Sequence, residues 1–299
     1  MEIGPNLCAV IVLYRERAQE SRTVQTLQRA LSLDPSLAAR LLVCIYDNTP
    51  EPYPVPEDLF PAETLVFQPG ENLGLPPAYN KALEVAEAQG ISWLLLLDSD
   101  TDLTASFLAA CVQQTKVLEN ERHIAAIVPH IVEGNIVHSP RRVQVLRRKA
   151  IPLGSSGIFP GELIALNSGA AVRVSAIRFL GAFTSEFWLD YLDYWLFRVL
   201  QTQGLRVFVL NEALEHSLSL SGLGRHMSLA RYQNMLEAEQ YFTSKYGTKW
   251  ERLRLKFVLL KRAFTVVLSP LTRQFLPLTV ANILRGGRDV PPQPSSRVQ

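Results

Sequence analysis

The run from Trp93 to Asp100 constrains the fold of this chain more than any other stretch, because five apolar residues are followed at once by Asp98-Ser99-Asp100. An apolar run of this length between polar residues is typical of a buried strand. In α/β proteins, ligands bind beyond the carboxyl ends of the parallel strands. Residues two apart on a strand lie on the same side, so we expect Asp98 and Asp100 to face one crevice.

Two neighbouring carboxylates repel one another, so a cation between Asp98 and Asp100 is one interpretation of the motif. Mg²⁺ commonly takes one or two protein carboxylates and completes its shell with water and substrate phosphates. The other interpretation is a strand followed by a polar turn, because Asp and Ser are frequent turn residues. A short acidic motif by itself leaves both interpretations open.

Apolar runs alternate with segments of helical spacing through most of the chain. Strands are expected at 7–14, 41–46, 65–67, 93–97, 124–129 and 205–210, a further apolar segment at 167–174, and helices at 21–33, 76–89, 104–118, 187–203 and over most of 228–268. The basic segment 138–149 is expected to be a loop or a hairpin. Strands that alternate with helices of about a dozen residues indicate an α/β fold with a mostly parallel, Rossmann-like sheet flanked by helices.

The composition narrows the class and the compartment. The chain has 299 residues, of which 47% are hydrophobic and 19% charged, so a large core is available and wholesale disorder is excluded. Three widely spaced cysteines, Cys8, Cys44 and Cys111, fit buried thiols in a reducing compartment better than disulfides. We see no signal peptide and no uncharged apolar run of about 18 residues, so we expect a cytoplasmic protein.

Charge divides the chain into two parts. Residues 1–225 hold 18 Lys/Arg and 24 Asp/Glu, whereas residues 226–299 hold 12 and 4. We therefore expect one α/β domain at 1–225 and a basic helical extension at 226–299, disordered from about Asp289. A basic tail predicts an anionic partner, either a membrane surface or a nucleic acid. Residues 250–268 mix large apolar and basic side chains, as in helices that lie at a membrane interface; the alternative is a helix packed on the domain.

Two further polar motifs follow predicted strands. Asp47-Asn48 follows the second strand, where such side chains can bond a ribose or a base edge, or simply begin a turn. The turn with Asn72 and Gly74 leads into a helix, whose free N–H groups and dipole favour anions. The alternative for this turn is a helix start capped by Asn72.

Asp190 and Asp193 are three residues apart in an aromatic stretch, so we expect them on one helical face. A carboxylate there is either a satisfied helix-start charge or a general base with a tuned pKa. His216 follows the last predicted strand and becomes a candidate metal ligand only if the metal site is real.

Taken in order, these motifs resemble family 2 glycosyltransferases of the GT-A fold, and among them the bacterial rhamnosyltransferase-type enzymes of surface polysaccharide synthesis. The matching motifs are the first strand ending near Tyr14, Asp47-Asn48, Asn72-Leu73-Gly74 with Asn80, Asp98-Ser99-Asp100, Ser168-Gly169-Ala170, Gly181-Ala182-Phe183, the stretch from Trp188 to Trp195 with Arg198 and Gly204, and His216. The resemblance covers about residues 7–245. The chain departs from the family pattern at Asp47-Asn48-Thr49-Pro50 and at Pro76-Pro77, which concerns recognition of the donor base.

The resemblance implies an inverting hexosyl transfer, with rhamnose as one candidate, from a UDP-, dTDP- or GDP-sugar to a hydroxyl of a glycan or lipid-linked acceptor. Mg²⁺ or Mn²⁺ would lie between the donor diphosphate and Asp98 and Asp100, and Ser99 would adjoin the donor. The nucleoside would contact Asp47, Asn48, Asn72 and Gly74. Asp193 would be the base and Asp190 a second acid near the acceptor, with their ranking open. His216 would contact the metal or the diphosphate.

Two other classes compete with this interpretation. A nucleotidyltransferase also uses an acidic metal site, but it is expected to have a glycine- and basic-rich loop after the first strand, and Tyr14-Arg15-Glu16-Arg17 contains no glycine. A nucleic-acid-binding protein is the second. The tail shows no recognisable binding motif and its charges lie among large aliphatic residues, so no nucleic acid partner is expected.

Overall fold

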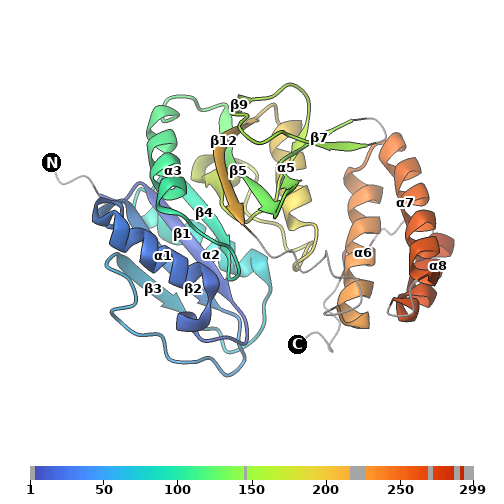
Figure 1. The fold of residues 1–299 in the computed structure, drawn as a ribbon, viewed down its shortest axis with the longest axis horizontal. Helices are drawn as coiled ribbons and strands as arrows, with labels where there is room; N and C mark the ends of the chain where they lie inside the picture. Colours follow the sequence, from blue (N-terminus) through green and yellow to red (C-terminus); the bar gives the residue numbers. More distant parts are fainter. Residues whose placement is uncertain (1–3, 145–146, 216–226, 269–271, 286–289, 293–299) are drawn as a thin grey trace.

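The structure is a computed structural model that describes residues 4–144, 147–215, 227–268, 272–285 and 290–292 (Figure 1). His216 lies outside the described residues, as do Asp289 and the last seven residues of the predicted disordered end. The described part forms an α/β body followed by a group of three helices at one end (Figure 1).

The body is built on a sheet in the order β3-β2-β1-β4-β11-β5-β12-β9, with β6 beside β5. Its strands are β1 (Leu7–Leu13), β2 (Leu41–Asp47), β3 (Glu63–Phe67), β4 (Trp93–Asp98), β5 (Ile124–Glu133), β6 (Ile136–Ser139), β9 (Gly157–Ile158), β11 (Ala170–Arg173) and β12 (Arg206–Glu215). β1 to β4 are mutually parallel, β12 is parallel to β5, and β11 lies antiparallel between β4 and β5. The predicted mostly parallel sheet is confirmed.

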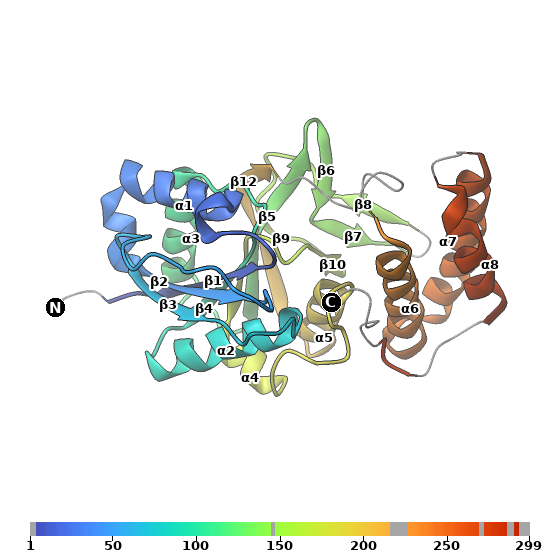
Figure 2. The same ribbon diagram turned by 90° about the horizontal axis from the view of Figure 1, so that it is seen from below.

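Helices cover both faces of this sheet (Figure 2). On one face lie α1 (Arg22–Leu33) and α3 (Ala105–Val117), and on the other α2 (Leu75–Ala88), α4 (Val174–Phe179) and α5 (Leu192–Thr202). Two buried clusters result, one around Leu27 and Phe107 and one around Tyr79 and Phe197. Single turns complete the body at η1 (Ala18–Glu20) and η2 (Pro35–Arg40). The prediction that helices flank the sheet is confirmed. They pack there because each has an apolar stripe that faces the sheet.

The basic segment forms a hairpin away from the main sheet. β7 (Arg141–Val143) pairs antiparallel with β8 (Arg148–Ala150), and β10 (Leu163–Ile164) adds to β7. Of the two predictions for residues 138–149, the hairpin is confirmed. The hairpin extends toward the C-terminal helices (Figure 1).

The C-terminal helices are α6 (Leu229–Tyr246), α7 (Lys249–Leu268) and α8 (Leu276–Arg285), with the turn η3 (Arg273–Phe275) before α8. They share a small core that includes Tyr232, Leu236 and Leu259. The other side of α6 joins the main core, where the ring of Phe242 lies 6.1 Å from that of Phe187. None of the helices in the described ranges is long and apolar enough to cross a membrane. The three cysteines are free and buried.

Some boundaries differ from the sequence prediction. The strands β5 and β12 extend past residues 129 and 210, where they were expected to end. The helix expected from residue 187 begins only at Leu192, because Tyr191 has a left-handed backbone (φ 72°) that a helix cannot contain. α8 lies within the extension that was expected to be helical. Pro277 lies in the first turn of α8, where a helix needs no N–H donor.

Candidate active site

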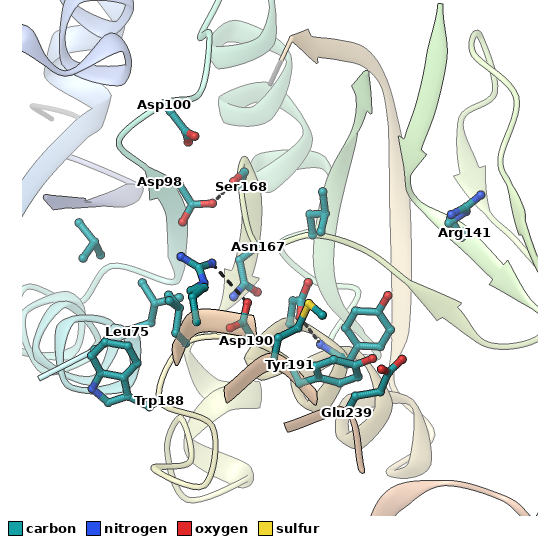
Figure 3. A pocket seen from close by; sticks show the side chains of 18 of the residues that line it. Leu75, Asp98, Asp100, Arg141, Asn167, Ser168, Trp188, Asp190, Tyr191 and Glu239 are labelled. Atoms are coloured by element: carbon teal, nitrogen blue, oxygen red, sulfur yellow. Dashed lines mark hydrogen bonds and ion pairs between the residues drawn. The ribbon is translucent and has the colours of Figure 1, made fainter. Parts of the chain in front are cut away.

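A cavity of about 1030 Å³ lies at the carboxyl ends of the central strands. The parallel register pairs Leu13 with Asp47 and Val12 with Asp98, so the carboxyl ends of β1, β2 and β4 lie together along one side of the sheet. This row of strand ends, rather than an outer strand, is what the term sheet edge denotes. Polar and charged residues lining the cavity are Tyr14, Asn48, Asn72, Asp98, Ser99, Asp100, Arg141, Arg147, Arg148, Asn167, Ser168, Asp190, Tyr191, Asp193, Tyr194, Arg231, Glu239, Arg254, Lys261 and Arg262. In the view of Figure 3, Asp98 and Asp100 lie at one end and Tyr191 and Glu239 at the other.

Asn48 fixes one wall of the cavity by bonding the turn that precedes α2. Its side-chain N–H donates to the carbonyl oxygen of Gly74 (2.9 Å), and its side-chain oxygen accepts from the N–H of Leu73 (3.1 Å). Asn72 in turn accepts from the N–H of Gly74 (3.2 Å). Asn48, Asn72 and Gly74 therefore form one hydrogen-bonded unit at the cavity, and their contact with a nucleoside stays a prediction.

Gly74 also joins this turn to the segment that carries the two later carboxylates. Its backbone has φ 80° and ψ −166°, a region open essentially to glycine alone, and a Cβ there would lie 2.7 Å from the ring of Trp188. The next N–H, of Leu75, donates to the carbonyl oxygen of Trp188 (3.0 Å). This N–H at the start of α2 is therefore occupied by a hydrogen bond within the protein, although the sequence suggested that such N–H groups bind an anion.

Asp47 does not line the cavity. The residue is almost fully buried; its Oδ1 accepts from the N–H of Thr49 (3.0 Å) and its Oδ2 lies 3.4 Å from the side-chain N–H of Gln68. These contacts are those of a turn-stabilising aspartate. A direct nucleoside contact by Asp47 stays a prediction, whereas Asn48 beside it faces the cavity.

The N-terminus of α1 holds the backbone of the acidic motif. The hydroxyl of Ser21 donates to the carbonyl oxygen of Ser99 (2.8 Å), and the N–H of Thr23 donates to the same oxygen (3.1 Å). The hydroxyl of Thr23 also accepts from the N–H of Thr101 (2.9 Å). Together with a hydrogen bond from the Thr23 hydroxyl to the carbonyl oxygen of Asp98 (2.5 Å), these contacts fix three residues of the turn from a helix start some 75 residues earlier in the sequence.

The carboxylate of Asp98 accepts a hydrogen bond from the hydroxyl of Ser168, which precedes β11. Asp98 is half-buried and Asp100 is exposed, and both line the cavity. Burial raises the pKa of nearby Glu16, and the negative charges of Asp100 and Asp47 raise it further. Glu16 therefore adds a third carboxyl to this end of the molecule.

The residues at this end fit a hard divalent cation that completes its shell with a ligand. Within the described ranges, no cluster of three His, Cys, Asp or Glu side chains could hold a metal by itself. Asp98 and Asp100 offer the one or two carboxylates that Mg²⁺ or Mn²⁺ takes when substrate phosphates supply further oxygens. His216, the third predicted ligand, lies outside the described residues.

Asp190 and Asp193 do not lie together on one helix, which corrects the sequence prediction. Asp193 is in the first turn of α5, but Asp190 precedes the left-handed Tyr191 and belongs to the connecting turn. Both still line the cavity. The charges of Asp98 and Asp193 each raise the pKa of the fully buried Tyr79, so both carboxylates lie near that one hydroxyl. The acidic motif and the α5 carboxylate thus share a cavity.

Asp193 has the electrostatics of a proton acceptor near neutral pH. Burial raises its pKa to about 7, and the charges of Asp190 and Asp98 act in the same direction. The N–H of Tyr194, which donates to Oδ1 (2.8 Å), and Arg148 oppose this rise. A carboxylate with such a pKa takes up a proton more readily than an ordinary aspartate, and it is half ionised at about pH 7.

Asp190 is instead paired. Its Oδ1 lies 3.3 Å from the guanidinium of Arg231 on α6. Burial raises the pKa of Asp190, and Arg231 opposes that rise. A carboxylate held by a neighbouring guanidinium is less available to accept a proton than one without such a pair, so Asp193 is the more available of the two.

The wall opposite the sheet edge is cationic. The guanidinium of Arg148, from the β7–β8 hairpin, stacks on the ring of Tyr194 at 4.5 Å. Burial lowers the pKa of Arg254 on α7, and the positive charge of Arg148 lowers it further, so two guanidinium groups face the same space. Lys261 joins them there, while Arg262 is bonded to Glu239 (2.9 Å). Like charges held together favour binding of an anion.

These far-wall residues were not identified from the sequence. Arg148 was expected in a basic loop or hairpin, and Arg231, Arg254 and Lys261 in a basic helical extension. That extension was expected to meet an anionic partner or to pack on the domain with its charges in solvent. The signal available was the density of Arg and Lys in both segments, but nothing in the sequence shows that the two segments meet. The sheet-edge residues, by contrast, lie where their motifs predicted, apart from Asp47.

No known family model matches the sequence, and none of the curated proteins matches it. Solved structures do match the fold, which is that of the GT-A glycosyltransferases. Because the sequence identity to these structures is only 12–14%, the likeness shows the fold alone.

Three structures of Staphylococcus aureus TarS are among those that match. Residues 1–349 of TarS superpose with a TM-score of 0.50 at 14% identity, over 94% of this chain and 88% of that one. The same part of TarS in complex with UDP-GlcNAc gives a TM-score of 0.54 at 12% identity, over 95% and 82%. Against a longer TarS structure, the chain spans about half the other's length, 54%.

Proposed function

We propose that this protein is an inverting glycosyltransferase that moves a hexose from a nucleotide-diphosphate donor to a hydroxyl of an acceptor. The observation that carries the proposal is the shared cavity: Asp98 and Asp100 lie at a sheet edge, and Asp193, with a pKa near 7, faces the same space. The GT-A fold and a neighbour solved with UDP-GlcNAc support a nucleotide-sugar donor.

The donor belongs at the sheet edge. Asn48, Asn72 and Gly74 form the hydrogen-bonded wall on which the nucleoside lies, with Ser99 close to the diphosphate. Asp98 and Asp100 would hold Mg²⁺ or Mn²⁺, which when bound stabilises the negative charge of the leaving diphosphate. Their side chains supply the hard oxygen ligands that such a cation requires.

Transfer needs one proton acceptor and one leaving group. The Asp193 carboxylate takes the proton of the acceptor hydroxyl, whose oxygen forms a bond to the anomeric carbon. The bond between that carbon and the diphosphate oxygen breaks, and its electron pair leaves with the nucleoside diphosphate. Attack opposite the leaving group inverts the anomeric configuration. Such positioned base catalysis contributes about 10²–10⁴-fold. Asp190, paired with Arg231, orients the acceptor end.

The finer identity rests on the sequence motifs. Their resemblance to rhamnosyltransferase-type enzymes supports rhamnose as the sugar, and bacterial surface polysaccharide synthesis at the cytoplasmic side of the membrane as the setting. The acceptor is then a glycan or a lipid-linked sugar. The buried free thiols agree with a reducing compartment.

The proposal is tested by the products and by Asp193→Asn. In separate incubations, the full chain is given UDP-, dTDP- or GDP-sugars, or nucleoside triphosphates together with a sugar phosphate. Each incubation is done with and without Mn²⁺, and the nucleotide and phosphate products are separated. A glycosyltransferase releases a nucleoside diphosphate, whereas a nucleotidyltransferase releases pyrophosphate when it uses a nucleoside triphosphate. Release of pyrophosphate, or no binding of any of these donors by calorimetry, would overturn the proposal.

Asp193→Asn should reduce transfer by about 10²–10⁴-fold while donor affinity changes little. The variant should remain folded, because above pH 7 the native protein holds an ionised, half-buried carboxylate whose pKa is about 4 when unfolded. The amide carries no such charge, so its melting temperature at pH 8 should equal or exceed that of the parent. Wild-type turnover by Asp193→Asn would show that another group is the base.

A further inference from the structure

α7 carries an apolar stripe that no described residue covers. Trp250, Leu253, Phe257, Leu260, Phe264 and Val267 are 40–67% exposed. They follow one another at intervals of three and four residues, so they lie on one side of the helix. The opposite side is the packed one, where Leu259 and Val266 are each 3% exposed in the core shared with α6 and α8. A contiguous exposed apolar surface of this kind marks an interaction site.

Basic side chains flank the stripe on both sides. Lys249, Arg252 and Lys256 are exposed along one flank, and Arg254 and Lys261 lie along the other. Glu251 is the acidic residue of α7, and it lies 2.6 Å from the buried guanidinium of Arg198 rather than on the stripe. The surface is therefore an apolar band between two cationic borders, which matches an anionic partner with an apolar interior.

The stripe is continuous with the mouth of the cavity. Arg254, Phe257, Val258 and Lys261 line the cavity, and Phe257 is also 61% exposed within the stripe. Successive residues of a helix are rotated by about 100°, so the cavity side of α7 directly adjoins the stripe. Whatever covers the stripe consequently lies beside the cationic wall of the cavity.

We propose that α7 binds the headgroup region of an anionic lipid bilayer, with the stripe at the acyl boundary and the cavity mouth facing the bilayer surface. Charge decides against a second copy of this chain, because pairing two such helices would bring Lys and Arg borders together without carboxylates between them. Anionic lipids satisfy both borders at once. The consequence that the acceptor is drawn from the bilayer rests on the proposed function; the docking itself does not.

The test is co-sedimentation of the full chain with vesicles of phosphatidylcholine alone or mixed with phosphatidylglycerol. The stripe variant combines Leu260→Ser, Phe264→Ser and Val267→Ser, none of which lines the cavity. The matched control combines Leu33→Ser, Phe179→Ser and Val117→Ser, which are 73%, 70% and 60% exposed at the ends of α1, α4 and α3. We expect the stripe variant to lose at least about tenfold in affinity for the anionic vesicles and the control to lose none.

The charged borders are tested separately with Arg252→Gln and Lys256→Gln, which also lie outside the cavity lining. Each should weaken binding to anionic vesicles by about fivefold at low salt, corresponding to about 1 kcal/mol per charge. Equal binding to both kinds of vesicle, or equal losses in the stripe variant and its control, would overturn the proposal. So would a concentration-dependent dimer that the stripe variant abolishes without vesicle binding. Donor affinity is measured by calorimetry on each variant. Loss of vesicle binding with unchanged donor affinity concerns the lipid surface alone, whereas absence of donor binding in the parent chain concerns the proposed function.

Discussion

The two ends of the cavity are built in different ways. At the sheet edge, short side chains such as Asn48, Ser21 and Thr23 bond backbone groups directly, and the strands beneath them are fully buried. At the far wall, long side chains such as Arg148 and Arg254 reach in from a hairpin and from α7. The first end is rigid because it belongs to the core. The second depends on how α6 and α7 are held to the α/β body.

The buried guanidinium of Arg198 connects the α/β body to α6 and α7. Arg198 on α5 lies 2.6 Å from Glu162 and 2.6 Å from Glu251 at the start of α7, and it donates to the carbonyl oxygen of Tyr246 (3.0 Å). Burial alone would raise the pKa of Glu251, but hydrogen bonds from Arg198 and Thr248 lower it. The far wall is therefore held by this charge network together with the packing of α6 on the main core, whereas the sheet edge is held by backbone hydrogen bonds and buried strands.

The largest effect is expected from Arg198→Gln, which removes this connection. Breaking a buried ion pair leaves unpaired charges and costs about 3–5 kcal/mol. We expect that loss in urea unfolding, together with faster amide hydrogen exchange in α7 than in β1 and β4. The control is Arg178→Gln, because Arg178 also lies 2.5 Å from a glutamate but on the surface, where a pair contributes at most about 1 kcal/mol. Equal losses in the two variants would show that the far wall does not depend on Arg198.

A smaller effect is expected from Gly74→Ala, which disturbs the sheet edge at its contact with Trp188. The backbone there costs a non-glycine residue about 1–3 kcal/mol, and the added Cβ also displaces the segment that leads to Asp190 and Asp193. Transfer should fall with stability. Gly204→Ala is the control, since Gly204 has nearly the same φ (78°) but nothing within 4 Å of its Cβ position. Equal activity in the two variants would show that contact with Trp188 does not position the carboxylates.

The same contrast explains what the sequence could predict. Strand periodicity is local and the carboxyl ends of parallel strands meet by topology, so the cavity at β1, β2 and β4 and the position of Asp98 and Asp100 followed from the sequence. The position of the far-wall residues did not follow, because Arg148 and Arg254 come from the β7–β8 hairpin and from α7, which meet only in the tertiary structure. No local signal indicates such a contact.

Two further positions depend on details that the sequence does not show. The helix at Asp190 was predicted too long because a tyrosine with positive φ contradicts the ordinary preference of that residue. For Asp47 the sequence left both a turn and a nucleoside contact open. The structure places Thr49 and Gln68 at its oxygens, and the nucleoside contact stays a prediction.

Asp100→Ala tests the sheet edge without disturbing its packing, because Asp100 is exposed. If a cation joins the motif to the donor diphosphate, the Mn²⁺-dependent part of donor affinity should fall by about tenfold, corresponding to about 1.4 kcal/mol. Calorimetry with and without Mn²⁺ measures it. Asp102→Ala is the control, since that carboxylate is bonded to Arg22 (2.5 Å) and does not line the cavity. An unchanged affinity in Asp100→Ala would remove the metal from the proposal.

The smallest effect concerns the pH dependence of transfer and links the two ends of the cavity. Because Asp193 has a pKa of about 7 and must be ionised to act, the rate should rise with pH through about 7. The negative charge of Asp190 raises that pKa, so Asp190→Asn should move the rising limb to lower pH. Arg231→Gln leaves the charge of Asp190 unopposed and should move the limb to higher pH. Opposite shifts in these two variants require that Asp193 is the base and that α6 reaches it electrostatically. A limb that stays in place in both would assign the titration to another group.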